Sequence, residues 1–351
     1  MKTFEEIFID KTKYGVRVQT SEYGEWGKHI IIDQGQLQIA GYTDREEGLF
    51  EEVPVVIFGD HTRVIKYVDE PFFLGADGVK VLRSKDENAN YKYLYYALKN
   101  VKIPNTGYNR HFKWLKEVQI NYPDKNKQAE IVGTLDKVSN IIRKREAELS
   151  ALDTLIKARF VEMFGDPVAN PKHWPVKKLK ELSVQINSGN TPKGGSENYV
   201  KKGITFFRSQ NVWKDRLEMD DIAYIDAETH ASMKRSSLKH GDILMTKTGR
   251  INTENSSLGR AALYEGEDDM ANVNGHVYFI RLKEGINNKF VLRILVSPEY
   301  RDLIRSVCVG GIDKRQLNKE HIEDFPIICP QANMVDDYVA FVDQVDKSKL
   351  I

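Results

Sequence analysis

The second half of this chain resembles its first half. Residues 63–98 fall on residues 260–295 without a gap when they are shifted by 197 positions. Eight of the thirty-six aligned positions are identical, whereas average residue usage would give roughly two. The identical pairs are Arg63/Arg260, Tyr67/Tyr264, Glu70/Glu267, Gly78/Gly275, Glu87/Glu284, Asn90/Asn287, Lys92/Lys289 and Leu98/Leu295.

A second block of matches follows the first in the same order, at a shift of 207. Ten additional residues of the second copy therefore lie between the two blocks, around 296–316. A repeat of about 200 residues is too long for a solenoid and predicts two duplicated domains. The matched pairs of this block are Ile120/Ile327, Pro123/Pro330, Asn126/Asn333, Val132/Val339, Asp136/Asp343 and Val138/Val345.

Each copy is predicted to be an α+β module rich in loops. Short apolar runs typical of β-strands open each copy, and turn residues separate them. A short helix, a glycine-bearing loop, a last strand ending at Pro123 or Pro330 and a further helix follow. The predicted strands are 28–32, 53–58 and 79–82 in the first copy and 204–207, 242–245 and 276–280 in the second, and the short helices are 91–99 and 289–297.

One long helix is predicted between the copies, over residues 127–164. Its apolar residues recur at alternating spacings of four and three, the heptad pattern of a coiled coil, and Gly165-Asp166-Pro167 ends it. So long a stripe needs a partner helix, for which the matching helix 331–350 is the natural candidate; alternatively, the helix packs over its own domain. The stripe positions are Ile131, Leu135, Val138, Ile142, Leu149, Leu152, Ile156 and Met163, with Val335, Tyr338, Val342 and Val345 on the matching helix.

Charge and composition exclude several classes of protein. The 52 lysines and arginines nearly balance the 51 aspartates and glutamates, giving a formal charge of +1, so a nucleic-acid binder of this composition must gather its cations locally. No stretch of eighteen apolar residues exists and residues 1–10 hold Glu5, Glu6 and Asp10, which predicts neither a membrane span nor a signal peptide. Cys308 and Cys329 lack metal-ligand spacing and are expected to be reduced thiols of a cytoplasmic protein.

The sequence lacks the motifs of enzymes that act on DNA. It contains no Asn/Asp-Pro-Pro-aromatic tetrapeptide for methylation of a flipped base. Residues 189–196 outline a phosphate loop, but Gly195 stands where the lysine is required. Pro123-Asp124 is not followed by the Glu-x-Lys strand of a nuclease, and the eight histidines show no ligand spacing. We therefore predict no catalytic residue and no metal site.

Residues 188–213, SGNTPKGGSENYVKKGITFFRSQNVW, resemble the opening of a target-recognition domain in the specificity subunits of Type I restriction–modification systems. Gly241–Leu244 followed by Thr248-Gly249 is similar to the next block of that family. Residues 107–142 and 310–345 resemble the approach to the family's central and distal helices. The resemblance covers nearly the whole chain, and the order of these segments carries it.

The resemblance implies a specificity subunit without catalysis of its own. Target-recognition domains at residues 1–123 and 166–330 would each bind one half of a split, asymmetric site in double-stranded DNA. A central helix at 124–165 and a short distal helix at 331–351 would form an antiparallel coiled coil that sets the spacing between the half-sites. The implied fold class is α+β, with two similar domains joined by long helices.

The same resemblance implies two kinds of partner subunit. Methyltransferase subunits would carry S-adenosylmethionine, and motor-nuclease subunits would use ATP and Mg²⁺, so this chain itself would bind no cofactor and no membrane. Residues 126–131 depart slightly from the family, which usually has a Glu-Gln pair there. A larger departure is the distal helix, with about twenty residues against about thirty-eight in the first copy, which another chain could complete.

Base edges are read by side chains that form two hydrogen bonds, Arg with guanine and Asn or Gln with adenine. In each copy, three loops are predicted to bring such side chains together, although a structural role is an equal alternative at any single position. The match of Arg63 with Arg260 favours a shared structural or phosphate-binding role. The candidates are Gln34, Tyr42, Thr43, Arg45, His61, Arg63, Tyr108, Asn109, Arg110, His111 and Lys113 in the first copy, and Arg208, Ser209, Gln210, Asn211, Lys247, Thr248, Arg250, Asn252, Lys314, Arg315 and Gln316 in the second.

Two other classes of function stay open from the sequence. The same modules could form a stand-alone DNA-binding regulator, or a coiled-coil scaffold whose domains bind protein. Genes for a methyltransferase and a motor nuclease beside the gene for this chain would favour the restriction system.

Overall fold

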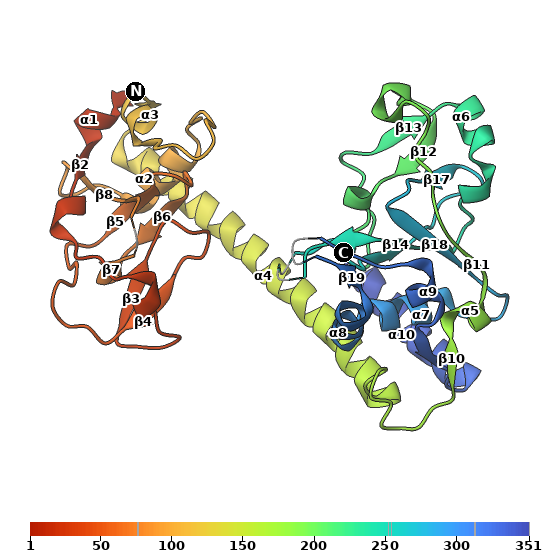
Figure 1. Ribbon diagram of the computed structural model, residues 1–351. Helices are drawn as coiled ribbons and strands as arrows, with labels where there is room; N and C mark the ends of the chain where they lie inside the picture. Colours follow the sequence, from red (N-terminus) through yellow and green to blue (C-terminus); the bar gives the residue numbers. More distant parts are fainter. Residues whose placement is uncertain (76, 252, 254, 312–313, 351) are drawn as a thin grey trace. The chain divides into compact units, whose positions relative to one another are not determined.

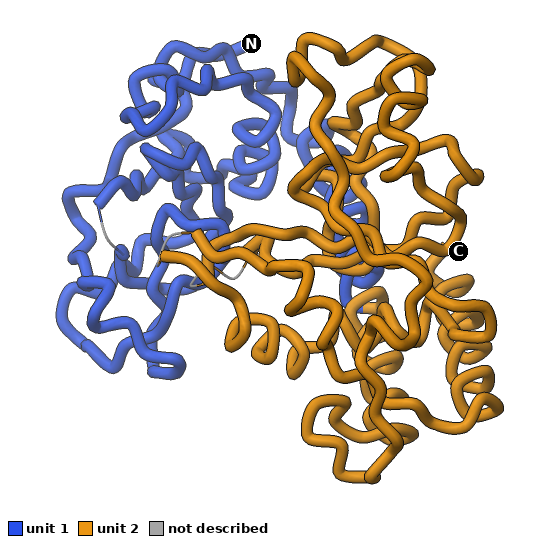
Figure 2. The backbone as a smooth tube through the Cα atoms, turned by 45° about the vertical axis from the view of Figure 1, so that its right-hand side comes forward, with its two compact units in different colours: residues 1–147 blue, residues 148–351 orange. Residues whose placement is uncertain are grey.

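The computed structural model describes residues 1–351 except 76, 252, 254, 312–313 and 351. Asn252, a candidate DNA contact, therefore lies outside the described residues. The chain divides into two compact units, residues 1–147 and 148–351 (Figure 2). The division falls inside one continuous helix, α4 (Lys125–Phe164), whereas the domain limits expected from the sequence lie at its two ends.

Unit 1 contains two main sheets (Figure 1). The first has the strand order β2-β8-β5-β6 and is antiparallel, and the second has the order β4-β3-β7, in which β3 and β7 run parallel. A short pair, β1 with β9, joins the beginning of the unit to the strand before α4. The elements are β1 (Lys2–Thr3), α1 (Phe4–Ile7), β2 (Phe8–Asp10), η1 (Thr12–Tyr14), η2 (Thr20–Glu22), β3 (His29–Ile32), β4 (Gly41–Thr43), β5 (Val55–Gly59), β6 (Ile65–Val68), β7 (Phe72–Leu74), β8 (Val79–Ser84), α2 (Tyr91–Lys99), α3 (Phe112–Lys116) and β9 (Gln119–Ile120).

Unit 2 repeats this topology. Its sheets have the orders β11-β18-β14-β16 and β13-β12-β17, again with one parallel pair, β12 with β17, and β10 pairs with β21. The elements are β10 (Val176–Lys178), α5 (Leu179–Leu182), β11 (Ser183–Ser188), η3 (Gly195–Asn198), β12 (Ile204–Phe207), η4 (Ser209–Asn211), β13 (Ala223–Ile225), α6 (Ala227–Ser232), η5 (Lys234–Ser236), β14 (Ile243–Thr246), β15 (Thr248–Gly249), β16 (Ala261–Leu263), β17 (Ala271–Val273), β18 (Val277–Leu282), α7 (Asn288–Leu295), α8 (Pro298–Val307), β19 (Val309–Gly310), β20 (Arg315–Gln316), α9 (Lys319–Glu323), β21 (Pro326–Ile328) and α10 (Ala332–Ser348).

Residues that match between the copies occupy the same structural positions. Asn90 and Asn287 both cap a helix, because each side chain accepts a hydrogen bond from the backbone three residues on. Lys92 forms an ion pair with Asp136 at 2.7 Å, and the matched Lys289 pairs with Asp343 at 2.5 Å. The two shifts found in the sequence therefore describe one duplicated module. The predicted fold class, two similar mixed modules joined by a long helix, is confirmed.

The ten additional residues of unit 2 lie where the alignment put them. Helix α8 has no counterpart between α2 and α3 of unit 1. Beyond it, β19 and β20 form a small antiparallel sheet with β15, because Thr248 pairs with Gln316 and Val309 pairs with the same residue from the other side. This insertion brings two loops that are far apart in the sequence to one edge of unit 2.

Helix α4 contributes to the cores of both units. Its first part packs Ile131 and Val132 against the core of unit 1. In unit 2, Phe160 and Phe164 are buried, and their ring centroids lie 5.5 Å from that of Tyr338 in edge-on contacts. Such geometry is favourable for aromatic rings. Gly165, at φ 78°, then ends the helix, because glycine adopts the left-handed conformation without a Cβ clash.

Helix α10 runs antiparallel to the part of α4 that belongs to unit 2. Tyr338, early in α10, lies beside Phe160 and Phe164, whereas Lys349, at its end, forms an ion pair with Asp153 at 2.7 Å. This agrees with the predicted antiparallel partner. Within this chain the stripe is buried only in part, since Val138 and Ile142 are 46% and 53% exposed.

We predict that Phe164→Ala lowers the free energy of unfolding of unit 2 by about 3–5 kcal/mol, the range for a large-to-small change in a core. Chemical denaturation followed by tryptophan fluorescence measures this, because Trp174 lies beside Phe164. Val161→Ala is the control, since Val161 is 54% exposed on the same helix. Equal stability of the two variants would contradict the proposed role of the aromatic cluster.

Candidate nucleic-acid interface

A concave surface of about 560 Å³ in unit 2 gathers candidate residues from three segments of the chain. Ser209 and Gln210 come from η4, directly after β12, and Thr248 and Arg250 come from β15 and the loop that follows it. Lys314 comes from the loop between β19 and β20. The β15–β20 pairing holds the last two segments together. The structure thus brings together five of the predicted residues of the second copy.

The first segment is fixed by Asp221. The Arg208 guanidinium lies 3.1 Å from its carboxylate, and the Gln210 amide donates a hydrogen bond to it at 2.9 Å. The bond from Gln210, followed by the charge of Arg208, holds the pKa of Asp221 below its usual range. Both side chains are therefore engaged within the protein, and base contacts by them would require this arrangement to change.

Asn211 is buried and has an internal role. Its amide nitrogen donates to the carbonyls of Glu218 and Asp221 at 3.1 and 3.0 Å, and its side-chain oxygen accepts from the backbone of Arg208. A side chain that is 1% exposed and saturated with hydrogen bonds cannot contact a base. The sequence-based assignment of Asn211 to DNA binding is at odds with this position.

Arg260 stabilises the loop that lines the concave surface. Its guanidinium lies 3.6 Å from the centroid of the Trp213 ring and its Nε donates to the carbonyl of Ser256 at 2.9 Å. Burial lowers the pKa of Arg260. The side chain therefore orders the loop around Ser256, which lines the surface. Its match Arg63 has a similar internal contact, donating to the carbonyl of Ile103 at 3.3 Å. A structural role fits both members of the pair.

The other candidates of unit 2 lie around the small sheet. The ammonium of Lys247 lies 5.7 Å from the centroid of the Tyr278 ring. Arg315 donates to the carbonyl of Cys308 at 3.4 Å, and Gln316 donates to Asn318 at 2.9 Å. These three side chains are half-buried and hold the sheet edge in place beside the exposed Arg250 and Lys314.

In unit 1, three loops converge on His61. The backbone N–H of His61 donates to the side-chain oxygen of Gln34 at 3.1 Å, and the His61 ring stacks on Tyr108 with centroids 4.8 Å apart. Gln34 also donates to the carbonyl of Asp77 at 2.7 Å. Tyr108 is 87% exposed, so its second face is open to a planar partner such as a base.

The loop that carries Tyr108 divides into an exposed and a buried part. Asn109 and Arg110 are exposed, and so is Lys113, whose ammonium lies 4.5 Å from the centroid of the Trp114 ring. His111 is completely buried, with its Nδ1 3.0 Å from the carbonyl of Asp60. His111 therefore anchors the loop, and its assignment as a DNA contact is at odds with the structure.

Tyr42, Thr43 and Arg45 are separated from this cluster. In the β3–β4 register, Thr43 lies opposite His29 at the start of β3, whereas Gln34 follows the end of that strand. Asp44, Glu46 and Glu47 surround Arg45 in the sequence, and such an acidic setting disfavours a DNA backbone. The sequence predicted that all the candidate residues of the first copy lie together. Only some of them do.

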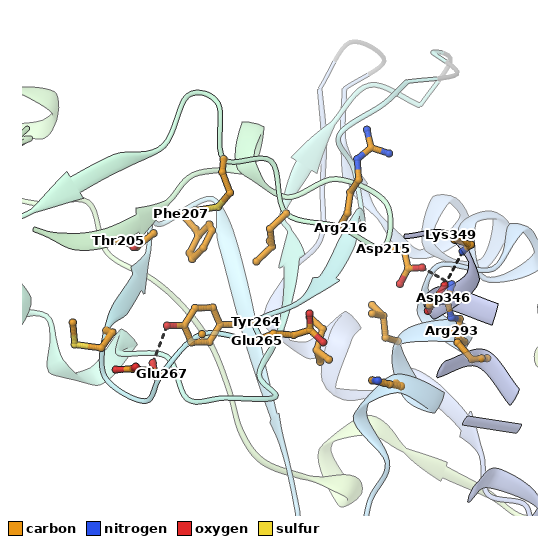
Figure 3. Close-up of a pocket in the computed structure, with 18 of the residues that line it drawn as sticks. Thr205, Phe207, Asp215, Arg216, Tyr264, Glu265, Glu267, Arg293, Asp346 and Lys349 are labelled. Atoms are coloured by element: carbon orange, nitrogen blue, oxygen red, sulfur yellow. Dashed lines mark hydrogen bonds and ion pairs between the residues drawn. The ribbon is translucent and has the colours of Figure 1, made fainter. Parts of the chain in front are cut away.

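A larger cavity of unit 2, of about 770 Å³, lies between the sheets and α7 and α10. Figure 3 shows charged side chains gathered at one end of it and Tyr264 at the other. Arg293 pairs with Asp215 and lies 3.7 Å from Asp346, which in turn pairs with Lys349 at 2.7 Å. Burial raises the pKa of Asp215. These groups neutralise one another and tie α10 to α7.

The described part of the chain contains no group of three or more His, Cys, Asp or Glu side chains placed to hold a metal ion. None of their helices combines the length and apolar character that a membrane span requires.

The chain is similar to proteins of Type I restriction–modification systems. Residues 43–151 match the profile of the Type I restriction modification DNA specificity domain. Over 351 residues, 95% of this chain and 83% of the relative, the chain is 23% identical to the Type I restriction enzyme EcoR124I/EcoR124II specificity subunit of Escherichia coli. The chain is thus similar to the specificity subunits of Type I restriction enzymes. A stand-alone regulator and a protein-binding scaffold are accordingly not favoured.

Solved structures have the same fold. The Type I restriction–modification S subunit from M. genitalium superposes with a TM-score of 0.56, at 18% identity, covering 99% of this chain and 91% of that one. A chain from a study of complex assembly and conformational transition of the type I restriction–modification system gives a TM-score of 0.50, at 14% identity, covering 99% and 90%. The fold of this chain is thus found in proteins of very different sequence.

Several residues of the interface were missed from the sequence. Trp213 lies beside the Arg260 guanidinium and the exposed Asp221 holds Arg208 and Gln210. The concave surface itself is also lined by Thr253, Asn255, Ser256 and Ser257. Trp213 ends the segment that resembles the family opening, so an aromatic side chain after the polar Arg208–Asn211 run was a usable signal. Asp221 lies ten residues beyond Asn211 in the sequence, and only the tertiary structure reveals that pairing.

We predict that the adjacent variants Asn211→Ala and Gln210→Ala differ in stability. Loss of the Asn211 side chain removes the partner of the Arg208 N–H and of the Glu218 carbonyl, and the free energy of unfolding falls by about 1–3 kcal/mol. The hydrogen bond from Gln210 to the exposed Asp221 contributes about 0.5 kcal/mol or less. Urea titration of both variants measures the difference, and a destabilising Gln210→Ala with a neutral Asn211→Ala would reverse the assignment.

Proposed function

We propose that this specificity subunit is a non-catalytic DNA reader in a Type I restriction–modification complex. The observation that carries the proposal is the concave surface of unit 2, where polar side chains from three segments meet. Ser209 and Thr248 supply hydrogen-bonding groups, Gln210 would do so on release from Asp221, and Arg250 and Lys314 supply charge. Hydrogen bonds to base edges specify a sequence, while cations on phosphates position the protein.

Unit 1 would read the other half of the site through a different set of side chains. Tyr108, Asn109 and Arg110 form an exposed loop tip beside His61. Because the two sets differ in chemistry, the two half-sites would differ in sequence, which gives a bipartite and asymmetric target in double-stranded DNA. The continuous helix α4 would set the number of base pairs between them.

The proposed partners are those implied by the family. Methyltransferase subunits would bring S-adenosylmethionine to the DNA, and motor-nuclease subunits would bring ATP and Mg²⁺. The E. coli relative is the specificity subunit of a Type I restriction enzyme, which supports an assembly of this kind. In such a complex, the chain contributes sequence recognition and leaves the chemistry to its partners.

We predict that Arg250→Ala and Lys314→Ala each weaken DNA binding in a salt-dependent way. A cation that contacts one phosphate contributes about 0.9 to the slope of log K against log salt, so each variant reduces the slope by about that amount. The assembled complex is titrated with DNA that carries the motif it methylates, at several salt concentrations. The slope is then compared between each variant and the wild type. Lys177→Ala on the exposed strand β10 is the control. An unchanged slope in both test variants would refute the proposed surface.

We also predict that residues 148–351 can be exchanged for those of a relative with a change in one half-site only. A junction at 148 keeps Phe160 and Phe164 together with Phe290 and Tyr338, whereas a junction at 166 would separate them. Methylome sequencing of cells that express the hybrid with its partner subunits reads out both halves. A hybrid that methylates sites altered in both halves would contradict independent recognition by the two units.

A further inference from the structure

The side-chain amide of Gln210 is held by a carboxylate that faces solvent. Gln210 lines the concave surface of unit 2, and its Nε2 donates a hydrogen bond to Oδ2 of Asp221 at 2.9 Å. The Asp221 side chain is 78% exposed. The contact is therefore a surface hydrogen bond, and it occupies a donor that a side chain needs for reading a base.

Arg208 fixes the position of this carboxylate. One guanidinium nitrogen lies 3.1 Å from Oδ2 of Asp221 and also donates to the Asp221 carbonyl. The Cζ of Arg208 lies 5.7 Å from the centroid of the Tyr199 ring, and the Arg208 side chain is only 18% exposed. Arg208 is thus anchored within unit 2 and neutralises Asp221 whether or not Gln210 stays bound. Departure of Gln210 breaks one surface hydrogen bond and leaves the carboxylate paired.

The corresponding glutamine of unit 1 is held differently. Gln34 follows β3, as Gln210 follows β12, and each of these strands belongs to the parallel pair of its sheet. Backbone groups engage both ends of the Gln34 amide, since its Nε2 donates to the carbonyl of Asp77 at 2.7 Å and its Oε1 accepts from the N–H of His61 at 3.1 Å. A glutamine between two backbone groups is fixed, whereas one on an exposed carboxylate can exchange that partner for another.

The DNA backbone and a base edge compete differently with the Asp221 carboxylate. A phosphate oxygen is also an anionic acceptor, and it can replace the carboxylate on Gln210 only by approaching a like charge. The major-groove edge of adenine is neutral and offers the N7 acceptor beside the N6 donor, which an amide matches with two hydrogen bonds. Adenine therefore replaces one surface hydrogen bond with two, and a phosphate meets repulsion.

We propose that Asp221 is a specificity-determining residue that takes the place of a phosphate oxygen on Gln210 until Gln210 turns to an adenine in the half-site bound by unit 2. The inference rests on the proposed function, because it names the base that the concave surface recognises at one position. Gln210 contacts the base, whereas Asp221 and Arg208 act through it as positioning residues. Without the carboxylate, the charge of Arg208 becomes available to the phosphates of any sequence.

Competition binding with altered motifs tests the choice of base. The motif methylated by the wild-type system is determined first, and each base pair of the two half-sites is then replaced in turn. Gln210→Ala in the assembled complex should lower discrimination about tenfold at one A·T pair of one half-site and leave the other half-site unchanged. Unchanged discrimination at every position, or a loss at a G·C pair, would overturn the assignment of adenine to Gln210.

Asp221→Asn tests the role of the carboxylate. The substitution keeps an acceptor oxygen for Gln210 but removes the charge that neutralises Arg208, so a phosphate can take its place. We expect the assembled complex to bind random-sequence DNA about fivefold more tightly, with the slope of log K against log salt steeper by about 0.9. Asp220→Asn removes the same charge from the adjacent exposed residue and should leave the slope unchanged. Combining Asp221→Asn with Arg208→Ala should abolish the gain.

Circular dichroism checks that all these variants fold. A slope for Asp221→Asn no steeper than that of the wild type, or an equal gain for Asp220→Asn or for the double variant, would overturn the role of Asp221. The salt slopes of Arg250→Ala and Lys314→Ala test the concave surface itself. If those slopes fall as expected while Asp221→Asn and Gln210→Ala behave as the wild type, the surface binds DNA and only the roles assigned to Asp221 and Gln210 are wrong.

Discussion

Burial of Phe160 and Phe164 against Phe290 and Tyr338 is the contact on which the arrangement of unit 2 depends. Removal of one such ring costs about 3–5 kcal/mol, whereas the partly exposed ion pair of Lys289 with Asp343 contributes about 0–1 kcal/mol. The aromatic cluster therefore supplies the stability. The ion pair, which recurs in unit 1 with the same geometry, fixes the register of the helices rather than the strength of their contact.

The duplicated frame and the binding loops are under different constraints. Strands β5 and β14 are buried along their whole length, and any change of volume there is felt by both faces of a sheet. The loops that carry Tyr108 and Arg250 tolerate changes of side-chain volume, because these side chains face solvent. This explains how two copies with the same sheet order and the same Asn helix caps present different chemical groups at their tips.

Backbone elements were predictable from the sequence where local patterns determine them. The short helix 91–99 was predicted at its observed limits and the long helix within two residues of its start, because capping residues and apolar periodicity are local signals. Side-chain direction in loops is not local. Gln210 is exposed and Asn211 buried, and Arg110 is exposed and His111 buried. His111 bonds to Asp60, far away in the sequence, and Asn211 bonds across its own loop to Glu218 and Asp221.

The heptad stripe illustrates the same limit. Its period identifies the contacting face of α4 only in part: Ile156 is buried and Leu152 packs beside it, but the buried Phe160 and Phe164 lie outside the predicted stripe. The period carries no information on the length of the partner helix, so the exposure of Val138 and Ile142 could not be read from it. A regular stripe predicts where a helix is able to be buried, and only the tertiary structure reveals where burial is complete within the chain.

Internal ion pairs explain the near-zero net charge of the chain. Arg281 donates two hydrogen bonds to the buried Asp242, and Arg293 pairs with Asp215, so many cations neutralise carboxylates inside the fold. Non-specific DNA affinity depends mainly on cations that reach phosphates, and a subunit with few of them binds random sequences weakly. The ratio of specific to non-specific binding decides whether a rare site is found among many others. If Arg250 and Lys314 contact phosphates as proposed, concentrating charge at these few loop positions favours discrimination over affinity, and the proposed partner subunits would supply the remaining affinity.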